Sequence, residues 1–554
     1  MNTKIALIAL FPSTKFPLIG ESHGICVISG YLMKKFGTDI DVELFDQQIN
    51  SNDEIISGIL NFRPDIIGFS LKIGTLPELE SLIPTLKYRY DENGIDLPII
   101  VFGNSVAHFN YEYLLKKYPQ SIISFGEGEV CFEDLVLFKQ NKLSDKQFIR
   151  NIAFVDYDSI IKTKFEYLSS AQIAQADRRN SIKFYRVGGE VYIEGSRGCH
   201  YCGCSICECR LFLGSKSIES RWRQKNVEVI LSEIALLEAI GIETVTFSDE
   251  DFWGSREKGT AHAYAIAKGI LNRGLKIEYR VNLRVKTIYN RNYSEEEISQ
   301  IKNTLSALKR SGLTKVFLGF ESGSPSQLQR YSKGFILEEF VEAKKILDEL
   351  GIEYELGFIS FDPMMSLEEL VESLMFIRDN DCIPYISNIF KELRIQNGND
   401  SYINMIRRYE FKHSCKIIGE LDLNEQIYPI INYIDQRIDV IVSLFRKYEK
   451  GMYKLYYFMR IITQYSKEKA LGIEKKIHDV LGQIKILDFE FMMSCCLALQ
   501  DDLRNDELII QYNNAKSSRD KLLNGLYDWL QYNSSPKSEL LKILHNNYQC
   551  GINH

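Results

Sequence analysis

The sequence predicts an α/β protein made of a doubly wound, Rossmann-like parallel sheet, then a partial or full β/α barrel, and finally a mostly helical C-terminal domain. Short β-rich runs alternate with helical stretches before about Tyr157 and again from Val191 to Phe361, and this alternation is typical of parallel sheets covered by helices. After about Arg378 the pattern changes to long helical segments rich in Lys, Glu, Leu and Ile.

The composition is that of a folded, multidomain protein. The chain has 554 residues, of which 45% are hydrophobic, and this provides enough apolar material for several cores. The net charge of -7 is modest, and Lys and Arg are scattered instead of forming a basic stripe, so nucleic acid is not an expected partner. No apolar run is long enough to span a membrane, and the first residues lack a signal-peptide cleavage region. We therefore expect a cytoplasmic protein with no membrane segment.

The domain boundaries follow from the changes of pattern. A polar connector that contains SSAQIAQADRRNS separates the two alternating regions. We expect a first domain over residues 1–156, a linker over 157–182, the barrel over 183–378 and the helical domain over 379–554.

The loops after the strands of the first domain are its expected binding edge. Parallel sheets bind ligands beyond the carboxyl ends of their strands. The turns that would form this edge are Pro12 to His23, Ser70 to Pro77, Gly103 to His108 and Gly126 to Glu129.

A cluster of cysteines indicates a metal site. Five of the twelve cysteines fall between Cys199 and Cys209, in GSRGCHYCGCSICECR, directly after an expected barrel strand. In a cytoplasmic chain such clustering favours metal over disulfides. Two CxxC pairs could suggest zinc, but a single residue separates them, whereas structural zinc sites place a dozen or more between their pairs. Soft thiolate ligands on one loop are what an iron-sulfur cluster needs.

The cysteine segment resembles that of the cobalamin-binding branch of the radical S-adenosylmethionine (SAM) superfamily. Cys199, Cys204 and Cys207 give CxxxxCxxC, one residue longer than the usual CxxxCxxC, and Ile206 stands in the slot that is usually aromatic. The resemblance implies that these three residues hold a [4Fe-4S] cluster and leave one iron open for SAM. Cys202 or Cys209 could replace one of these three ligands.

Later segments resemble the SAM-binding motifs of the same family in the expected order. The resemblance implies that an acidic turn meets the SAM ammonium, with Glu250 as the candidate and Asp249 as its rival. Arg284 would pair with the SAM carboxylate, as suits a guanidinium group. In GFESGS, Glu321 and Ser322 match the residues that contact the ribose, and in GFISFDP, Ile359 would pack on the adenine.

The first domain resembles the cobalamin-binding module of this branch. The resemblance implies that glycine-rich turns approach the corrin, because glycine lets the backbone come close to a ligand. No DxHxxG sequence is present, so an axial histidine from that motif is not expected. A nicotinamide-binding domain is disfavoured by the lack of GxGxxG, and a methylthiotransferase by the lack of a cysteine triad in this domain. The expected cobalamin contacts are Ser70, Gly74, Gly103, Gly126, Glu127 and Gly128.

The resemblance implies a methyltransferase that acts on an unactivated carbon of a natural-product or peptide substrate through methylcobalamin and a 5′-deoxyadenosyl radical. An alternative keeps the same cofactors but cyclises, rearranges or oxidises the substrate without methyl transfer. A non-catalytic cobalamin or redox sensor is a third hypothesis. An enzyme of this type also needs an external one-electron reductant of the flavodoxin or ferredoxin type. No residue is predicted to act on the substrate directly.

Overall fold

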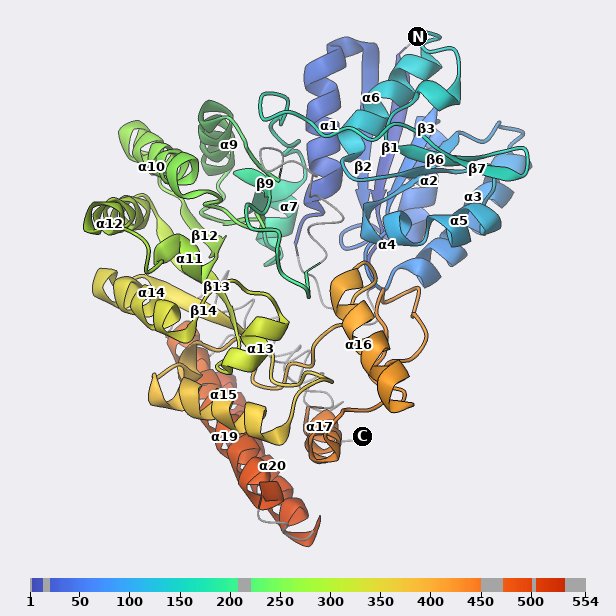
Figure 1. The fold of residues 1–554 in the computed structure, drawn as a ribbon. Coiled ribbons are helices and arrows are strands. Elements are labelled where there is room, and N and C mark those ends of the chain that lie inside the picture. The colour runs from blue at the N-terminus through green and yellow to red at the C-terminus, as the bar shows by residue number, and fades with distance from the viewer. Residues whose placement is uncertain (1, 13–19, 208–220, 450–471, 501–504, 534–554) are drawn as a thin grey trace.

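The computed structural model describes residues 2–12, 20–207, 221–449, 472–500 and 505–533. Figure 1 shows three regions in chain order: a blue-to-cyan α/β unit, a green-to-yellow α/β unit beside it, and orange-to-red helices, of which one orange helix lies next to the first unit and the red helices extend away from both units. The α/β prediction with a helical C-terminal region is confirmed.

The first sheet has the strand order β2-β1-β3-β4-β5-β6-β7, and its strands are parallel except at the β5-β6-β7 edge. Helices cover both of its faces. The strands are β1 (Thr3–Ala9), β2 (Ile40–Asp46), β3 (Ile66–Ser70), β4 (Ile99–Gly103), β5 (Ile122–Ser124), β6 (Ile152–Asp156) and β7 (Ser159–Lys162). The helices are α1 (His23–Phe36), α2 (Asn52–Phe62), α3 (Leu76–Glu92), α4 (Asn104–Phe109), α5 (Tyr111–Lys117) and α6 (Gly128–Lys139). Strand β7 lies within residues 157–182, so the sheet continues into the segment expected to be a linker.

Alternation along β1 explains why helices cover both faces. Ile5 and Leu7 pack into the core beneath α1 and α6, whereas Ala6 and Ile8 pack into the core beneath α2 to α5. Since successive side chains of a strand point to opposite faces, a strand that is apolar at consecutive positions requires a core on each side.

The second sheet is an open, parallel arrangement in the order β14-β13-β12-β11-β8, which corresponds to the partial form of the predicted barrel. A separate antiparallel pair, β9 and β10, follows β8. The strands are β8 (Tyr192–Ile193), β9 (Ser196–Gly198), β10 (Trp222–Gln224), β11 (Thr244–Phe247), β12 (Glu278–Leu283), β13 (Leu313–Glu321) and β14 (Glu353–Phe358). The helices of this region are α7 (Ser181–Arg186), α9 (Val227–Ala239), α10 (Arg256–Arg273), α11 (Val285–Ile288), α12 (Glu295–Arg310), α13 (Pro325–Arg330) and α14 (Leu337–Leu350).

Local sequence signals set several helix starts. Three helices begin with a Ser-x-x-Glu capping box, in which the serine side chain and the glutamate side chain satisfy two backbone N–H groups of the first turn. Caps of this kind stabilise a helix by about 1 kcal/mol each. The pairs are Ser51 with Glu54, Ser294 with Glu297, and Ser366 with Glu369.

The C-terminal region contains more irregular chain than the helical pattern predicts. Its helices are α15 (Leu367–Asp379), α16 (Asp400–His413), α17 (Gln436–Tyr448), α19 (Ile473–Gln500) and α20 (Asn505–Asn533). Helices α19 and α20 pack along each other and against α15 and α17. The stretch between α15 and α17 also reaches the first domain, where the Gly74 N–H donates to Asn424 O (2.8 Å) and the Asn110 side chain donates to Leu423 O (2.8 Å).

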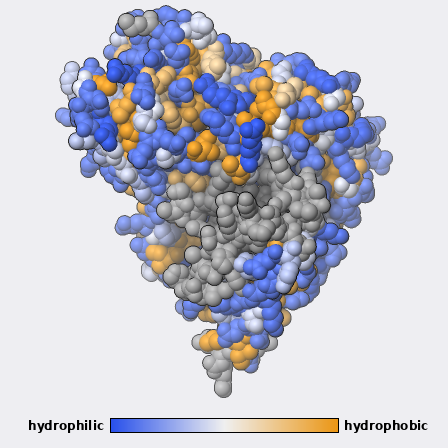
Figure 2. Space-filling model, turned by 180° about the vertical axis from the view of Figure 1, so that it is seen from behind, coloured by the Kyte–Doolittle hydropathy of each residue, from blue (hydrophilic) through white to orange (hydrophobic). Residues whose placement is uncertain are grey.

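The described surface is mixed in character. On the face shown in Figure 2, hydrophilic and apolar side chains alternate across the described residues. Within the part of the chain that the structure describes, every helix is too short or too polar to cross a bilayer.

Candidate functional site

The cysteine loop leaves β9 and runs beside the carboxyl ends of the central strands. Cys199 and Cys204 are half-buried, and Cys207 is exposed. Cys202 has a left-handed backbone (φ 46°), and its Sγ lies 2.8 Å from Cys199 O. Cys209 lies outside the described residues. No group of three Cys, His, Asp or Glu side chains among the described residues is arranged to hold a metal ion, so the cluster triad stays a prediction.

The loop is held by hydrogen bonds to the turn after α13. The Ser205 N–H donates to Tyr331 O (3.0 Å), and its hydroxyl donates to Arg330 O (2.8 Å). The Tyr201 hydroxyl donates to Ser332 O (2.7 Å). These contacts position the cysteines next to the strand ends, where the sequence places the SAM motifs.

Ile359 connects the loop to the region that follows the barrel. Ile359 is buried in an apolar cluster with Tyr331 and Leu393, and the side chain of Ile206 packs against this cluster. The Asn399 amide donates to Ile206 O at 2.9 Å. The predicted adenine contact and the residue before Cys207 therefore share one apolar surface.

Two cations lie near the thiols. Burial raises the pKa of Cys204, and the charge of Lys333 opposes this shift. A hydrogen bond donated by the Cys199 thiol to Cys202, burial and the charge of Asp251 raise the pKa of Cys199, and Arg284 opposes that shift. Because cluster ligands are thiolates, positive charges at these positions favour the form that binds iron. The donor chemistry of the loop thus fits an iron-sulfur cluster.

Arg284 is fixed by a residue that the sequence analysis missed. Its Nε lies 2.6 Å from Asp251 Oδ2, and its Nη2 donates to Gly254 O at 3.0 Å. Asp251 Oδ2 also lies 3.9 Å from Cys199 Sγ. The order FSDED gives three adjacent carboxylates, and nothing in that order marks Asp251 as the partner of a distant arginine.

Asp249 and Glu250 have different surroundings. Asp249 accepts hydrogen bonds from the Gly195 N–H (2.9 Å) and the Ser196 hydroxyl (2.5 Å), so its carboxyl group is part of the framework. Glu250 accepts one from the Gly198 N–H (3.2 Å) and lines a cavity. Burial raises the pKa of both carboxyl groups to about 7. Between the two, Glu250 is the carboxyl that faces open space.

Glu321 and Ser322 lie at the end of β13. Glu321 has a left-handed backbone (φ 72°), and its Oε1 lies 3.4 Å from Lys333 Nζ. Ser322 is buried, donates to Gln327 Oε1 (2.5 Å) and accepts from the Ser324 N–H (2.9 Å). Local partners thus already engage Ser322, whereas the partner of Glu321 is a lysine near the cysteine loop.

A cavity of about 1010 Å³, including its space open to solvent, lies between the first sheet and the barrel. Ser70, Gly103, Gly126, Glu127 and Gly128 all line it. The first domain also contributes Leu7, His23, Gly24, Ile25, Val27, Ile28, Gly68, Phe69, Val101, Asn104, Ser124, Glu129 and Phe132, and the barrel region contributes Glu194, Ser196, Arg197, Ser248 and Glu250.

The glycines of this region differ in what surrounds them. Gly126 has φ 58°, a left-handed conformation that favours glycine. A Cβ at Gly103 would meet Ser124 alone, at 3.8 Å, so the space beyond Gly103 is open. Gly74 does not line the cavity and instead lies against Pro12, which leaves its expected cobalamin contact without support from this cavity. The open backbone at Gly103 fits a large flat ligand, whereas a Cβ at Gly126 would meet Phe165 and a Cβ at Gly128 would meet Ile28.

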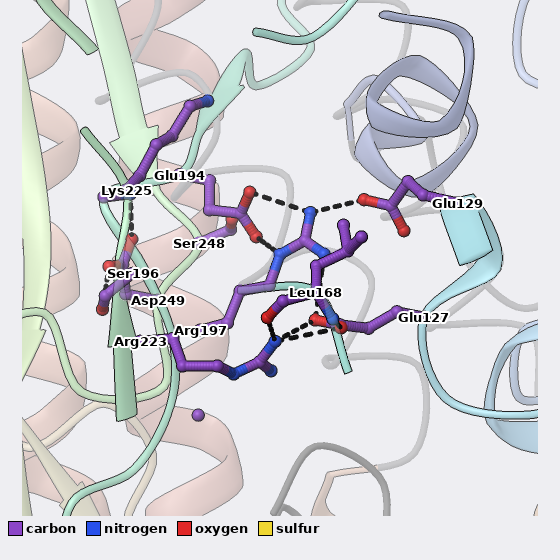
Figure 3. A network of polar contacts seen from close by, with 12 residues as sticks. Glu127, Glu129, Leu168, Glu194, Ser196, Arg197, Arg223, Lys225, Ser248 and Asp249 are labelled. Atoms are coloured by element: carbon purple, nitrogen blue, oxygen red, sulfur yellow. Dashed lines mark hydrogen bonds and ion pairs between the residues drawn. The ribbon is translucent and has the colours of Figure 1, made fainter. Parts of the chain in front are cut away.

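Glu127 belongs to a buried ion-pair network between the two α/β units (Figure 3). It accepts hydrogen bonds from Arg197 Nη1 (3.0 Å), from Arg223 Nη1 (2.8 Å) and from the Leu168 N–H (2.6 Å). Glu127 is one of the expected cobalamin contacts, but its carboxylate is engaged by protein groups. Arg197 and Arg223 are residues of the site that the sequence analysis missed.

Comparisons with known proteins agree with this geometry. The B12 binding domain family matches residues 13–136, and the radical SAM superfamily matches residues 193–377. The chain is 30% identical over 456 residues to the 4'-phospho-dehydrooxetanocin synthase of Priestia megaterium. The aligned region covers 79% of this chain and 58% of that protein. The chain therefore spans less than two thirds of that relative.

Two solved structures share the fold. The cobalamin-dependent SAM radical enzyme OxsB, with aqua-cobalamin and SAM bound, aligns with a TM-score of 0.84 at 21% identity, over 100% of this chain and 84% of OxsB. The radical SAM methyltransferase TsrM of Kitasatospora setae aligns with a TM-score of 0.58 at 16% identity, over 74% of this chain and 76% of TsrM. A B12-binding domain followed by a radical SAM domain, in a fold shared with OxsB, places this chain in the cobalamin-binding branch of the radical SAM superfamily.

Proposed function

We propose that this protein is a cobalamin-dependent radical SAM enzyme that removes a hydrogen atom from an unactivated carbon of a small molecule. The observation that carries the proposal is the convergence of the cysteine loop, the Glu250 turn and the cavity of the B12-binding domain at one edge of the barrel. When bound, the cluster and SAM supply a 5′-deoxyadenosyl radical, and cobalamin supplies a second reactive centre.

The chain's own residues have binding and positioning roles in this scheme. Cys199, Cys204 and Cys207 would hold the cluster, and Glu250 would accept the SAM ammonium. Arg284, oriented by Asp251, would bind the SAM carboxylate through its remaining N–H groups.

Two further residues would orient the nucleoside part of SAM. Glu321 would accept a hydrogen bond from the ribose, and Ile359 would offer its apolar surface to the adenine. The cavity between the sheets would hold the corrin, with Ser70, Gly103, Gly126 and Gly128 at its wall. The electron for SAM cleavage would come from an external reductant of the flavodoxin or ferredoxin type.

The fate of the substrate radical separates two candidate functions. Rearrangement, cyclisation or oxidation without methyl transfer is supported by the relative from Priestia megaterium, which is named as a synthase and not as a methyltransferase and whose similarity extends over most of this chain. Transfer of a methyl group to carbon, the function that the family resemblance implies, is supported by the likeness in fold to the methyltransferase TsrM. We favour the first of these and keep methyl transfer as the second candidate.

Isotope labelling of SAM distinguishes the two functions. With the methyl group of SAM trideuterated, we expect 5′-deoxyadenosine to form and the small-molecule product to carry no label. A product heavier by one trideuterated methyl group, measured by mass spectrometry, would assign methyl transfer instead. A reduced, cluster-loaded protein that formed no 5′-deoxyadenosine would contradict the enzyme proposal and favour a sensor.

We expect SAM binding to strengthen with pH through Glu250. Because burial raises the pKa of Glu250 to about 7, the carboxyl group is mostly protonated at pH 5.5 and half ionised at pH 7. Only the ionised form pairs with an ammonium, so SAM affinity should rise roughly tenfold between these values. SAM keeps its ammonium over this range, since α-amino groups titrate near 7.7–8.0. Calorimetric titration measures the dissociation constants.

The matched variant is Glu250→Gln, which should bind SAM more weakly and with a much flatter pH profile. Burial also raises the pKa of Asp249 to about 7, but its carboxyl group accepts hydrogen bonds from Gly195 and Ser196 and should contribute little to the pH dependence of SAM binding.

The stability of the SAM-free protein should change with pH in the opposite direction. Because the folded-state pKa is raised, the contribution of Glu250 to stability is lost as pH rises toward 7. If SAM affinity changed with pH equally in Glu250→Gln and in the unmodified protein, Glu250 would be excluded as the partner of the SAM ammonium.

A further inference from the structure

The buried ion-pair network in Figure 3 joins the B12-binding domain to the strand that leads into the cysteine loop. Arg197 is its centre. Its Nε donates to Glu194 Oε1 (2.6 Å), its Nη1 donates to Glu127 Oε1 (3.0 Å), and its Nη2 donates to Glu129 Oε1 (2.6 Å). A single guanidinium thus bridges two carboxylates of the first domain and one of the barrel.

The network is buried and its charges do not balance. Arg197 and Arg223 contribute two positive charges, whereas Glu127, Glu129 and Glu194 contribute three carboxylates, which leaves one excess negative charge (2 - 3 = -1) if all are ionised. Removal of Arg197 would leave three buried carboxylates close together with one cation. Because buried charges that lose a partner are strongly unfavourable, the two units would separate or shift at this point.

The same residues line one predicted cofactor site and, through Arg197, adjoin the other along the chain. Glu127, Glu129, Glu194 and Arg197 line the cavity of the B12-binding domain. Along the chain, Arg197 is followed by Gly198, whose N–H donates to Glu250, and then by Cys199. A shift of the Arg197 guanidinium would therefore change the wall of the cavity and the start of the cysteine loop together.

We propose that Arg197 is a positioning residue that couples cobalamin binding to the iron-sulfur loop. Each cofactor stabilises the arrangement in which Arg197 bridges Glu129 and Glu194, so that each binds more tightly when the other is present. By linkage, the coupling must be equal in both directions. The inference rests on the proposed function, because it requires that both cofactors bind.

The test is a comparison of cobalamin affinity with and without the cluster. The full-length protein is titrated with hydroxocobalamin, anaerobically, once loaded with iron and sulfide and once after iron removal by a chelator, and absorption spectra give each dissociation constant. For the unmodified protein we expect about tenfold tighter binding in the cluster-loaded form, within the usual range of coupling between sites. For Arg197→Gln we expect equal affinities in the two forms.

Two further variants separate coupling from general stability. Arg197→Lys keeps the charge, but its donors sit on one nitrogen instead of the three spread nitrogens that reach the three carboxylates of Glu194, Glu127 and Glu129, so it should lose most of the coupling. Arg178→Gln is the matched control, because Arg178 forms equally buried ion pairs with Glu21 of the first domain and Glu233 of the barrel but does not line the cavity. This control should lower the unfolding temperature and keep the tenfold difference.

The outcomes are distinct. Equal cobalamin affinities in the two forms of the unmodified protein, or a tenfold difference that persists in Arg197→Gln, would overturn the coupling role and leave the proposed function intact. A protein that binds no cobalamin and forms no 5′-deoxyadenosine would contradict the proposed function itself. If Arg197→Gln does not fold, Glu129→Gln serves the same purpose. It replaces the Glu129 carboxylate, a partner of Arg197, by an amide of the same shape, and it is expected to reduce the coupling.

Discussion

Replacement of Cys199 by alanine is expected to abolish the cluster and with it the cleavage of SAM. With two of three thiolates, two of the four irons would lack a protein ligand, and the loop would no longer retain the cluster. We expect iron to fall from about four atoms per chain to near zero. Formation of 5′-deoxyadenosine should fall by at least about a thousandfold, or about 4 kcal/mol in the barrier. Iron analysis and chromatography of the reaction measure both.

The neighbouring cysteines provide controls for this experiment. Cys202→Ala should keep iron and activity, since Cys202 is outside the predicted triad, and Cys415→Ala should do the same because Cys415 is exposed on a different part of the chain. If Cys202→Ala loses the cluster while Cys204→Ala retains it, Cys202 is a ligand in place of Cys204. Full iron content in Cys199→Ala would contradict the assignment of Cys199 as a cluster ligand.

Replacement of Gly103 by leucine is expected to block cobalamin while the fold survives. The backbone at Gly103 is extended (φ -134°), which any residue adopts, and a Cβ there would have Ser124 as its near contact at 3.8 Å. The rest of the leucine side chain would project into the cavity. We expect cobalamin affinity to fall by at least about a hundredfold, or about 2.8 kcal/mol, with an unfolding temperature close to that of the unmodified protein. Absorption titration and thermal unfolding measure the two effects.

Substitutions at two other glycines are the controls for Gly103→Leu. Gly525→Leu adds the same side chain to α20, where a Cβ has no atom within 4 Å, and should leave cobalamin binding unchanged. Gly68→Ala should instead reduce stability, because its Cβ would lie 2.4 Å from the Phe132 ring and 2.9 Å from Leu7. Unchanged cobalamin affinity in Gly103→Leu would show that the corrin binds elsewhere.

Short-range patterns made the fold predictable. The alternation of strands and helices and the Ser-x-x-Glu helix starts depend on residues close in sequence, and the structure contains the corresponding elements. The polar segment after Tyr157 was the exception, because β7 pairs with β6 in a hairpin that its sequence composition does not indicate. The irregular chain between α15 and α17 was also not predictable, since its contacts are with distant parts of the molecule.

For the site, the sequence by itself determined the chemistry that is available. The cysteine spacing, the acidic turn and the glycines of the first domain identify the family because each is a local arrangement of residue types. The tertiary structure decided which of these groups are free to act. It places Glu127 in an ion pair with Arg197, Ser322 in contact with Gln327, and Gly74 away from the cavity.

The sequence does not show which groups are free to act, because the partners in these ion pairs lie far apart along the chain. Arg197 lies 70 residues from Glu127, and Arg284 lies 33 residues from Asp251, so no local pattern reports that these charges meet. Whether a buried carboxylate is neutralised by a protein cation or left for a ligand depends on that meeting. Residue types and spacing thus fix what a loop can bind, and the packing of the two sheets fixes which side chains remain available to bind it.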